Sequence, residues 1–256
     1  MLPCLAPLFP PPWREHATGV ALAPPGPAAP SLARWLDAPD GLAAALARHA
    51  AHIGAPGNAA AASVWSLTYF WRLLPPMVAA ASLLQRALPA ALTDLRLELD
   101  AHALPARFLL ADEGQPLPHS PTAQRYGTLL HRHIEPLAQR LRALTGLAPR
   151  IVWGNAARYL DVIFAELTRL QPDHDGLRDD RAHLLDGAAW PGGDNPMHRP
   201  VRVVTRATPE GPRDVALLRR CCLYYQLPGH DYCDLCPLAP GNRGARRCSA
   251  ETPADA

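Results

Sequence analysis

Residues 221–236 of the chain read Cys-Cys-Leu-Tyr-Tyr-Gln-Leu-Pro-Gly-His-Asp-Tyr-Cys-Asp-Leu-Cys. This segment holds four of the six cysteines, in the spacing C-C-x10-C-x2-C. Pro228-Gly229 predicts a turn near the middle, which would fold the second cysteine pair back toward the first. Four thiolates around one centre form a soft, anionic site that suits zinc or the iron of an iron–sulfur cluster.

The spacing of the cysteines bears on which metal the segment binds. Zinc sites usually take ligand pairs with at least two residues inside each pair, and Cys233 and Cys236 fit that rule. Cys221 and Cys222 do not fit it, because neighbouring side chains tend to point apart. A two-iron cluster spreads its ligands over two metal positions, so the adjacent pair favours [2Fe–2S]. A structural zinc knuckle, two disulfides and a disulfide between the adjacent cysteines stay open as alternatives.

The cysteine segment resembles the C-terminal module of the FhuF-type ferric-siderophore reductases. The resemblance rests on the adjacent cysteine pair at this spacing, the preceding Arg219-Arg220 and the following Pro237-Leu238. Weaker similarities lie upstream in chain order, over about residues 60–240: Ser63-x-Trp65, Tyr69-Phe70, Pro75-Pro76, Trp153-Gly154-Asn155 and Asn195-Pro196.

The resemblance implies a ferric-siderophore reductase. Cys221, Cys222, Cys233 and Cys236 would bind a [2Fe–2S] cluster and carry the electron transfer. The substrate would be a ferric siderophore of the hydroxamate type, whose hard oxygen ligands hold ferrous iron far less strongly than ferric iron. Reduction alone would therefore release the iron. Trp153 and Asn155 are the candidate substrate-binding residues.

Partners and compartment follow from composition and motifs. The net charge of +2 over 256 residues gives no field that would indicate nucleic acid. Six cysteines, four of them clustered, indicate a reducing compartment. The proline-rich start is a poor signal peptide, so we expect a cytoplasmic protein, with peripheral association at the inner membrane left open. The sequence has no phosphate-binding glycine loop or dinucleotide fingerprint. Electrons would therefore come from a separate protein or a diffusible reductant.

The remaining alternatives concern function and individual side chains. A non-catalytic protein-interaction module with a zinc knuckle is one alternative reading, and a siderophore-assembly or carrier protein is another. With four cysteines at hand, we expect His230 to be exposed; a hydrogen bond from it to a cluster sulfur is the next alternative, and a ligand role the last. Cys4 and Cys248 stand apart from the cluster and are expected to play no part in it.

The hydrophobic pattern predicts an α+β protein with a mainly helical body, a small antiparallel sheet and a C-terminal iron–sulfur module. We expect a flexible or loosely docked proline-rich leader over residues 1–30, the body over 31–206, and the module and tail over 207–256. The body has room for a sizeable core in 256 residues.

Individual elements are predicted from apolar spacing and from helix stop signals. A helix over 63–74 should end at Pro75-Pro76, and a second buried helix should start at Pro76. The alternation over 95–100 predicts a strand, and 122–144 reads as a long helix. Residues 151–153 are expected to be extended, with Asn155 capping the helix that follows. Residues 201–205 are strand-like.

Overall fold

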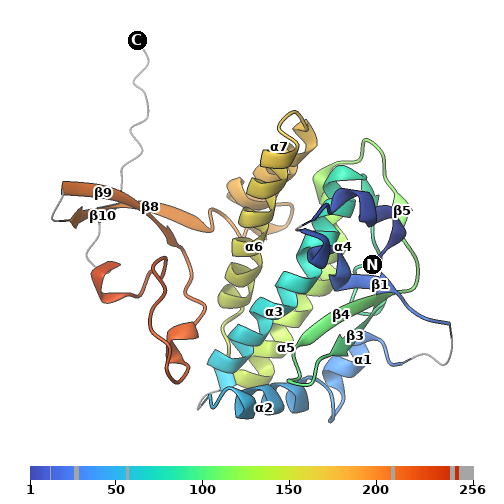
Figure 1. The fold of residues 1–256 in the computed structure, drawn as a ribbon, viewed down its shortest axis with the longest axis horizontal. Coiled ribbons are helices and arrows are strands. Elements are labelled where there is room, and N and C mark those ends of the chain that lie inside the picture. Colours follow the sequence, from blue (N-terminus) through green and yellow to red (C-terminus); the bar gives the residue numbers. More distant parts are fainter. Residues whose placement is uncertain (12, 26–28, 56–57, 209–210, 243–245, 248–256) are drawn as a thin grey trace.

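The computed structural model describes residues 1–11, 13–25, 29–55, 58–208, 211–242 and 246–247. Within these residues, the helices of the body are α1 (Leu32–Asp37), α2 (Leu42–His52), α3 (Asn58–Val78), α4 (Thr122–Leu129), α5 (Glu135–Thr145), α6 (Pro149–Leu170) and α7 (Asp175–Arg181) (Figure 1). The longer strands are β1 (Val20–Leu22), β3 (Leu95–Leu99), β4 (Pro105–Leu110), β8 (Val201–Thr208) and β9 (Gly211–Leu218). Two-residue strands are β2 (Arg86–Ala87), β5 (Gln115–Pro116), β6 (Ala189–Trp190), β7 (Gly193–Asp194) and β10 (Arg246–Arg247). The predicted α+β class is confirmed.

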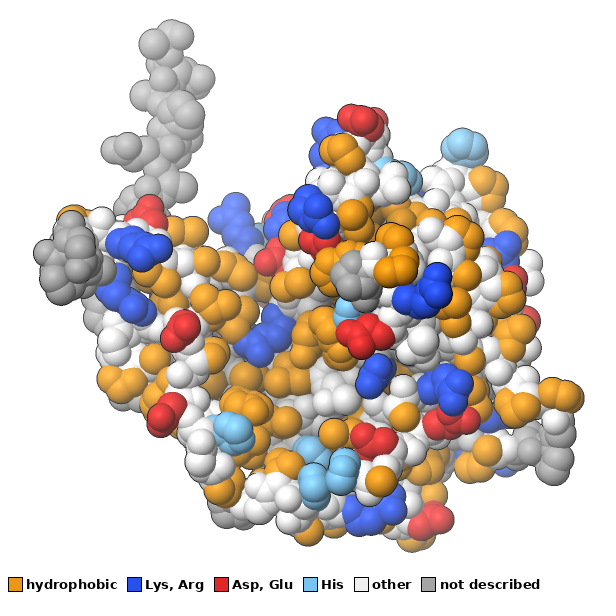
Figure 2. All heavy atoms as spheres, in the orientation of Figure 1, with side chains coloured by type: hydrophobic (Ala, Val, Ile, Leu, Met, Phe, Trp, Pro, Cys, Tyr) orange, Lys and Arg blue, Asp and Glu red, His pale blue; other side chains and the backbone are white. Residues whose placement is uncertain are grey.

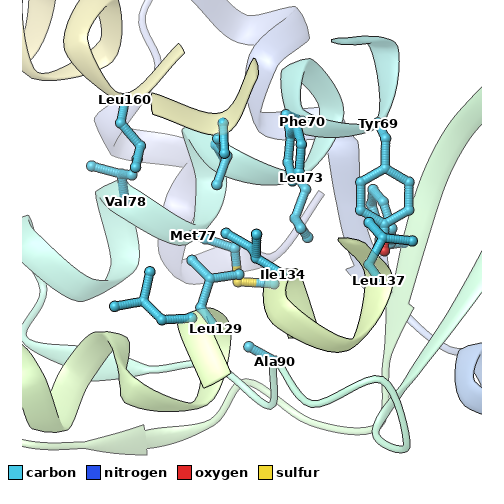
Figure 3. Packing of buried hydrophobic residues seen from close by; sticks show 14 of the residues in the cluster. Tyr69, Phe70, Leu73, Met77, Val78, Ala90, Leu129, Ile134, Leu137 and Leu160 are labelled. Atoms are coloured by element: carbon cyan, nitrogen blue, oxygen red, sulfur yellow. The ribbon is translucent and has the colours of Figure 1, made fainter. Parts of the chain in front are cut away.

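The long helices α3 and α6 pack against each other through the centre of the molecule (Figure 1). Apolar side chains cover several faces of α3, a pattern typical of a helix buried on more than one side. Figure 3 shows its side chains packed against those of the helical segments around it, among them Tyr69, Phe70, Leu73, Met77, Val78, Ile134, Leu137 and Leu160. Each large apolar side chain buried in this way contributes about 1.5–3 kcal/mol.

Helix α3 does not end at Pro75-Pro76, so that prediction was wrong. It runs on to Val78 and continues as a π-helical turn, Ala79–Leu83. Pro76 has no N–H to bond the carbonyl of Arg72 one turn earlier. Gly19 lies directly against that carbonyl, since a Cβ on Gly19 would be only 1.8 Å from the oxygen. The N-terminal segment thus packs where the prolines interrupt the helical hydrogen bonds, which local propensity cannot reveal.

Residues 1–30 are therefore not a flexible leader as far as the structure describes them. Short 3-10 helices over Pro3–Leu8 and Trp13–Gly19 precede β1, which pairs in parallel with β4. Leu2 and Leu5 are fully buried in the main core. The prolines limit regular structure in this segment, but its apolar side chains still bury surface against α3 and so hold it in place.

The predicted strand at 95–100 and the long helix at 122–144 are both confirmed in outline. Strand β3 pairs antiparallel with β4, and β1 adds to the other edge of β4. The helix is divided by a π-helical turn, Leu130–Ile134, which joins α4 to α5. Residues 151–153 are not extended: they lie inside α6, which starts at Pro149, so Asn155 is an interior helical residue. Proline is favoured at the first position of a helix, and this preference of Pro149 outweighs the preference of Asn155 for the N-cap position.

The antiparallel hairpin β8–β9 leaves the body and leads into the cysteine segment. Figure 1 shows the hairpin and this segment on the side of α6 away from the β1–β4–β3 sheet. The predicted boundary between residues 206 and 207 falls inside β8 and stays a prediction.

Two surface properties bear on partners. Among the described residues, the face drawn in Figure 2 has arginine and acidic side chains interspersed, without an extended region of one charge. Within the described ranges, none of the helices combines the length and apolar character needed to cross a bilayer.

A buried hydrogen-bonded chain joins α3 to the middle of the α4–α5 segment. The hydroxyl of Tyr69 lies 2.5 Å from Nε2 of His133, and Nδ1 of His133 lies 2.7 Å from the carbonyl oxygen of Ala90. The carbonyl can only accept, so Nδ1 carries the proton and Nε2 accepts from Tyr69. Burial raises the pKa of Tyr69 and lowers the pKa of His133 to about 4, so both stay neutral near pH 7.

We predict that His133 makes the protein less stable as pH falls from about 6.5 to about 4. In that window the unfolded chain binds a proton that the folded chain excludes, so stability falls with pH. The pKa difference corresponds to a loss of about 3 kcal/mol. The check is denaturant unfolding of the wild type and His133→Gln across this window. The variant should be less stable at pH 7 but should lose less stability on acidification. Equal slopes for the two proteins would contradict the prediction.

Candidate metal centre

The ends of the β8–β9 hairpin bring the two cysteine pairs together. After β9, the backbone N–H of Arg219 donates to the carbonyl oxygen of Pro200 at 2.7 Å, which fixes the chain just before the first pair. The N–H of Leu218 donates to the carbonyl oxygen of Leu235 at 2.9 Å, which ties the second pair to the same strand end. The expected turn at Pro228-Gly229 is present, with Gly229 at a φ of +74°. The loop between the pairs therefore folds back as the sequence predicts.

The four thiols share one small region. The thiol of Cys236 lies 3.5 Å from the sulfur of Cys221. Cys222 and Cys236 are buried, Cys221 is half-buried and Cys233 is exposed. The five cysteines that the structure describes are all free thiols, so the disulfide alternatives are not supported within it. Cys4 packs against the main core; Cys248 lies outside the described residues.

Tight backbone turns accompany both cysteine pairs. Leu223, directly after the pair, adopts a left-handed conformation with a φ of 63°. Its N–H turns back to donate to the sulfur of Cys221 at 3.3 Å. Between the second pair, the N–H of Cys236 donates to the carbonyl oxygen of Cys233 at 2.9 Å, which closes a tight turn. The backbone therefore supplies a donor to one sulfur and keeps the second pair compact.

The electrostatics of the thiols show that all four interact. Burial raises the pKa of Cys221 to about 12, and the sulfurs of Cys236 and Cys222 add to the rise. Burial likewise raises the pKa of Cys233, with further contributions from Cys236 and Cys222. Four mutually close thiolates are unfavourable unless a cation replaces their protons, which is the condition that a metal site provides.

In the part of the chain that the structure describes, no three His, Cys, Asp or Glu side chains are placed to hold a single metal ion. The sulfurs of Cys221 and Cys236 nevertheless lie in contact with each other.

Aromatic side chains frame the loop between the cysteine pairs. The rings of Tyr225 and Tyr232 are stacked with centroids 4.2 Å apart. His230 is exposed, as expected, and its ring lies 4.4 Å from that of Tyr224. These contacts stabilise the loop and give His230 a packing role.

A buried polar cluster anchors the cysteine segment to the helical body. The hydroxyl of Ser63 donates to the carbonyl oxygen of Cys222 at 2.7 Å, across 159 residues of sequence. The side-chain amide of Asn155 donates to the hydroxyls of Ser63 and Ser66 at 3.0 and 2.9 Å. We call these residues, Ser63, Ser66, Asn155 and Cys222, the anchor cluster. It joins α3, α6 and the cysteine segment, and sequence spacing gives no signal for it.

The Trp153-Gly154-Asn155 element lies against the cysteine segment, and each residue has a distinct contact. Trp153 packs edge to face on Trp190, with centroids 5.8 Å apart. Gly154 leaves room for Arg220, whose Cβ would be 2.7 Å from a Cβ placed on the glycine. Asn155 is only 2% exposed. These contacts position the cysteine segment, and the substrate-binding role of Trp153 and Asn155 stays a prediction.

The Asn195-Pro196 element is a structural turn. The side-chain amide of Asn195 donates to the carbonyl oxygens of Leu184 and Gly187 at 2.9 and 2.8 Å, and its oxygen accepts from the N–H of Met197 at 2.8 Å. The turn borders a hollow of about 250 Å³ that Gly154, Arg219 and Arg220 also line.

Two further side chains of α6 face the thiols and were missed in the sequence. Arg158 lies close enough to lower the pKa of Cys233 against the dominant effect of burial. Its Nη2 is buried without a hydrogen-bond partner. Tyr159 is near Cys222, whose charge adds to the rise that burial causes in the tyrosine pKa. On the sequence, both look like ordinary members of an amphipathic helix.

Comparisons with known proteins agree with this geometry. Residues 63–211 match the family model described as ferric iron reductase FhuF-like transporter, and residues 219–238 match that of the FhuF 2Fe-2S C-terminal domain. The chain is also similar to the ferric siderophore reductase of Escherichia coli strain K12, at 28% identity over 238 residues. That alignment covers 88% of this chain and 86% of the relative. The cofactor of the cysteine segment is therefore a [2Fe–2S] cluster, as predicted.

We predict that Ser63→Ala loosens the cysteine segment. The substitution leaves the Cys222 carbonyl without its buried donor, at a cost of about 1–3 kcal/mol. Ser82→Ala is a matched control, because the hydroxyl of this equally buried serine bonds Asp180 at 2.7 Å, outside the anchor cluster. Both variants should lower the thermal midpoint. Only Ser63→Ala should speed the loss of the cluster's visible absorbance in the presence of an iron chelator. Equal rates of cluster loss in the two variants would count against the anchor.

Proposed function

The chain belongs to the FhuF-like family of ferric iron reductases, and from that premise we propose that it reduces the iron of ferric siderophores. The observation that carries the proposal is the convergence of the four thiols at the end of the β8–β9 hairpin, within a segment that matches a 2Fe-2S domain. The match to a 2Fe-2S domain also counts against the zinc-knuckle and carrier readings, because neither function requires such a cluster.

We propose that Cys221, Cys222, Cys233 and Cys236 hold the cluster. Two thiolates on one tetrahedral metal with bonds of about 2.3 Å lie ~3.8 Å apart. The 3.5 Å between the sulfurs of Cys221 and Cys236 is close to that separation, so we assign these two to one iron. Cys222 and Cys233 are then left for the other. Neighbours in sequence would thus bind different irons, which removes the difficulty that an adjacent pair poses for a single ion.

The bound cluster supplies a one-electron carrier. The chain's own contribution is to hold it with one side near solvent, because Cys233 is exposed while Cys222 and Cys236 are buried. A ferric siderophore is too large for the hollow of about 250 Å³ beside Arg219 and Arg220. We therefore propose that the substrate approaches the exposed side of Cys233 from solvent.

The reaction needs no nucleophile or general base. A hydroxamate siderophore surrounds ferric iron with hard oxygen donors, which bind ferrous iron far less strongly. One electron delivered to the chelated iron therefore suffices to release it. We propose a hydroxamate-type substrate, a separate protein or diffusible reductant as electron source, and a cytoplasmic location with peripheral association at the inner membrane.

Arg158 is expected to raise the reduction potential of the cluster. A cation beside Cys233 offsets the added negative charge of the reduced form. At partial exposure this amounts to about 1 kcal/mol after screening, or tens of millivolts. Arg158→Gln should therefore lower the potential in a spectroscopic redox titration. Arg169→Gln is the matched control, since it removes the same charge eleven residues further along α6, roughly 16 Å away. Equal shifts in the two variants would contradict a local effect of Arg158.

The reaction itself is tested with dithionite-reduced protein freed of excess reductant. We predict that a ferric hydroxamate siderophore reoxidises it and that a ferrous trap accumulates its coloured complex. Cys233→Ser should lose this activity together with the cluster spectrum, because the substitution removes a thiolate ligand. Cys4→Ser, remote from the site, is the control and should retain both. A reduced cluster that persists unchanged beside several ferric siderophores would refute the proposed function.

A further inference from the structure

A second hollow is lined by Trp71, whose ring contacts that of Tyr159. It has a volume of about 440 Å³, within the range of small-molecule sites. Three parts of the chain form it: the N-terminal segment, Trp71 and Pro75 of α3, and the second half of α6. Its lining is mainly apolar and aromatic, with Trp13, His16, Trp71, Pro75, Val162 and Leu170 among its residues.

Ring contacts connect this hollow to the metal centre. His16 meets Trp71 edge to face, with centroids 4.6 Å apart, and Trp71 lies 5.4 Å from the ring of Tyr159. The charge of Cys222 reaches Tyr159, as its pKa shows after the larger effect of burial. An unbroken series of aromatic contacts therefore runs from the wall of the hollow to the neighbourhood of a cluster cysteine.

Helix α3 also connects the hollow to the cysteine segment. Trp71 and Ser63 lie on the same helix, eight residues apart, which corresponds to about 12 Å along its axis. Ser63 bonds the carbonyl of Cys222, so the hollow and the cysteine segment adjoin neighbouring stretches of α3.

The charges around the hollow select for a neutral ligand. Asp161 is paired with Arg181 at 2.7 Å, and Glu166 with Arg169. The positive charge of Arg169 is therefore already paired with a carboxylate, so this side chain attracts an anionic ligand such as a phosphate or carboxylate only weakly. Indole and imidazole rings on an apolar floor favour a flat aromatic ring.

We propose that this hollow binds the electron donor, a neutral, planar reductant of the hydroquinone type. The class includes naphthoquinols and the reduced isoalloxazine ring of flavins. The inference rests on the proposed function, which leaves open whether the electrons come from a separate protein or from a diffusible reductant. It gives a role to the aromatic residues of the N-terminal segment and to Trp71, which the cysteine segment does not require.

The proposed step balances in electrons and protons. The donor loses one electron and one proton and becomes a neutral radical, and a second turnover completes its oxidation. The electron would be taken up by the one-electron carrier that the four cysteines would hold. The proton passes to a ring nitrogen of His16 and from there to solvent. Burial keeps the pKa of His16 low, against the attraction of Glu15 and with the help of Arg72, so the ring is neutral and able to accept it.

The first test measures binding without any reductase assay. Oxidised menadione and oxidised lumiflavin are the probes, one for each source of the ring, and equilibrium dialysis gives the dissociation constant. We expect about 1–100 μM for at least one probe. Val162→Arg should weaken it by roughly tenfold or more, because the side chain, 59% exposed in the wild type, would cover the mouth of the hollow. Val203→Arg, at a 49% exposed valine on β8, is the matched control and should bind as the wild type does.

The second test follows the route through Tyr159. Menadiol or reduced lumiflavin is mixed anaerobically with oxidised protein, and the bleaching of the cluster is recorded by stopped flow. Tyr159→Leu should slow bleaching by about tenfold or more with binding retained, and Tyr159→Phe, which keeps the ring, should restore the rate. Reduction that proceeds equally in the leucine variant would overturn the aromatic route.

The outcomes separate this inference from the proposed function. If neither probe binds, or if Val162→Arg binds as tightly as the wild type, the donor site is refuted. Dithionite bypasses the hollow, so the wild type reduced in that way still reports on transfer to a ferric siderophore. Failure of that transfer would refute the proposed function, while the binding results would still decide whether the hollow takes a neutral aromatic ring.

Discussion

The hydrogen bond from the Ser63 hydroxyl to the Cys222 carbonyl is the contact on which the position of the metal centre depends. It is buried, and Asn155 holds the serine from the opposite helix. A buried carbonyl without a donor costs about 1–3 kcal/mol. Ser63 and Asn155 therefore favour the position in which the cysteine segment is packed against the body. The cysteine segment forms little regular structure of its own, apart from the 3-10 turns Tyr224–Gln226 and Pro240–Asn242. Its orientation is therefore set largely by the body, through this bond, the Gly154–Arg220 contact and the ends of the hairpin.

Electrostatics gives the same segment a strong preference for a bound group. Cys221 and Cys233 are partly removed from water beside other cysteines, so the pKa values of these two thiols rise and their thiolate forms are suppressed without a metal. Binding of iron replaces protons with cations and relieves this penalty, which couples the order of the segment to its cofactor. Arg158 adds a fixed positive charge on the body side. The two influences would together favour a negatively charged cluster beside helix α6.

The N-terminal segment has a different part in the architecture. Because Pro76 cannot donate to the Arg72 carbonyl, the backbone hydrogen bonding of α3 is interrupted near its C-terminal end. Gly19, which has no side chain, allows the N-terminal segment to approach that carbonyl. The segment brings His16 onto Trp71 and Trp13 onto His16, so that it both completes the core and builds the wall of the second hollow. A feature that reads as low-complexity sequence thus contributes aromatic surface at a defined place.

The sequence by itself determined the class of the fold, the confirmed strand and long helix, the turn at Pro228-Gly229 and the [2Fe–2S] cofactor. Each of these depends on local spacing or on a motif confined to a few residues, so a single sequence suffices. Tertiary structure alone decided that α3 passes through two prolines, that residues 1–30 pack into the body where they are described, and that Asn155 is an interior anchor rather than a helix cap. It also decided that Ser63, Arg158 and Tyr159 adjoin the cysteines. These outcomes depend on contacts between segments up to 159 residues apart, whose burial and hydrogen bonding outweigh local preference.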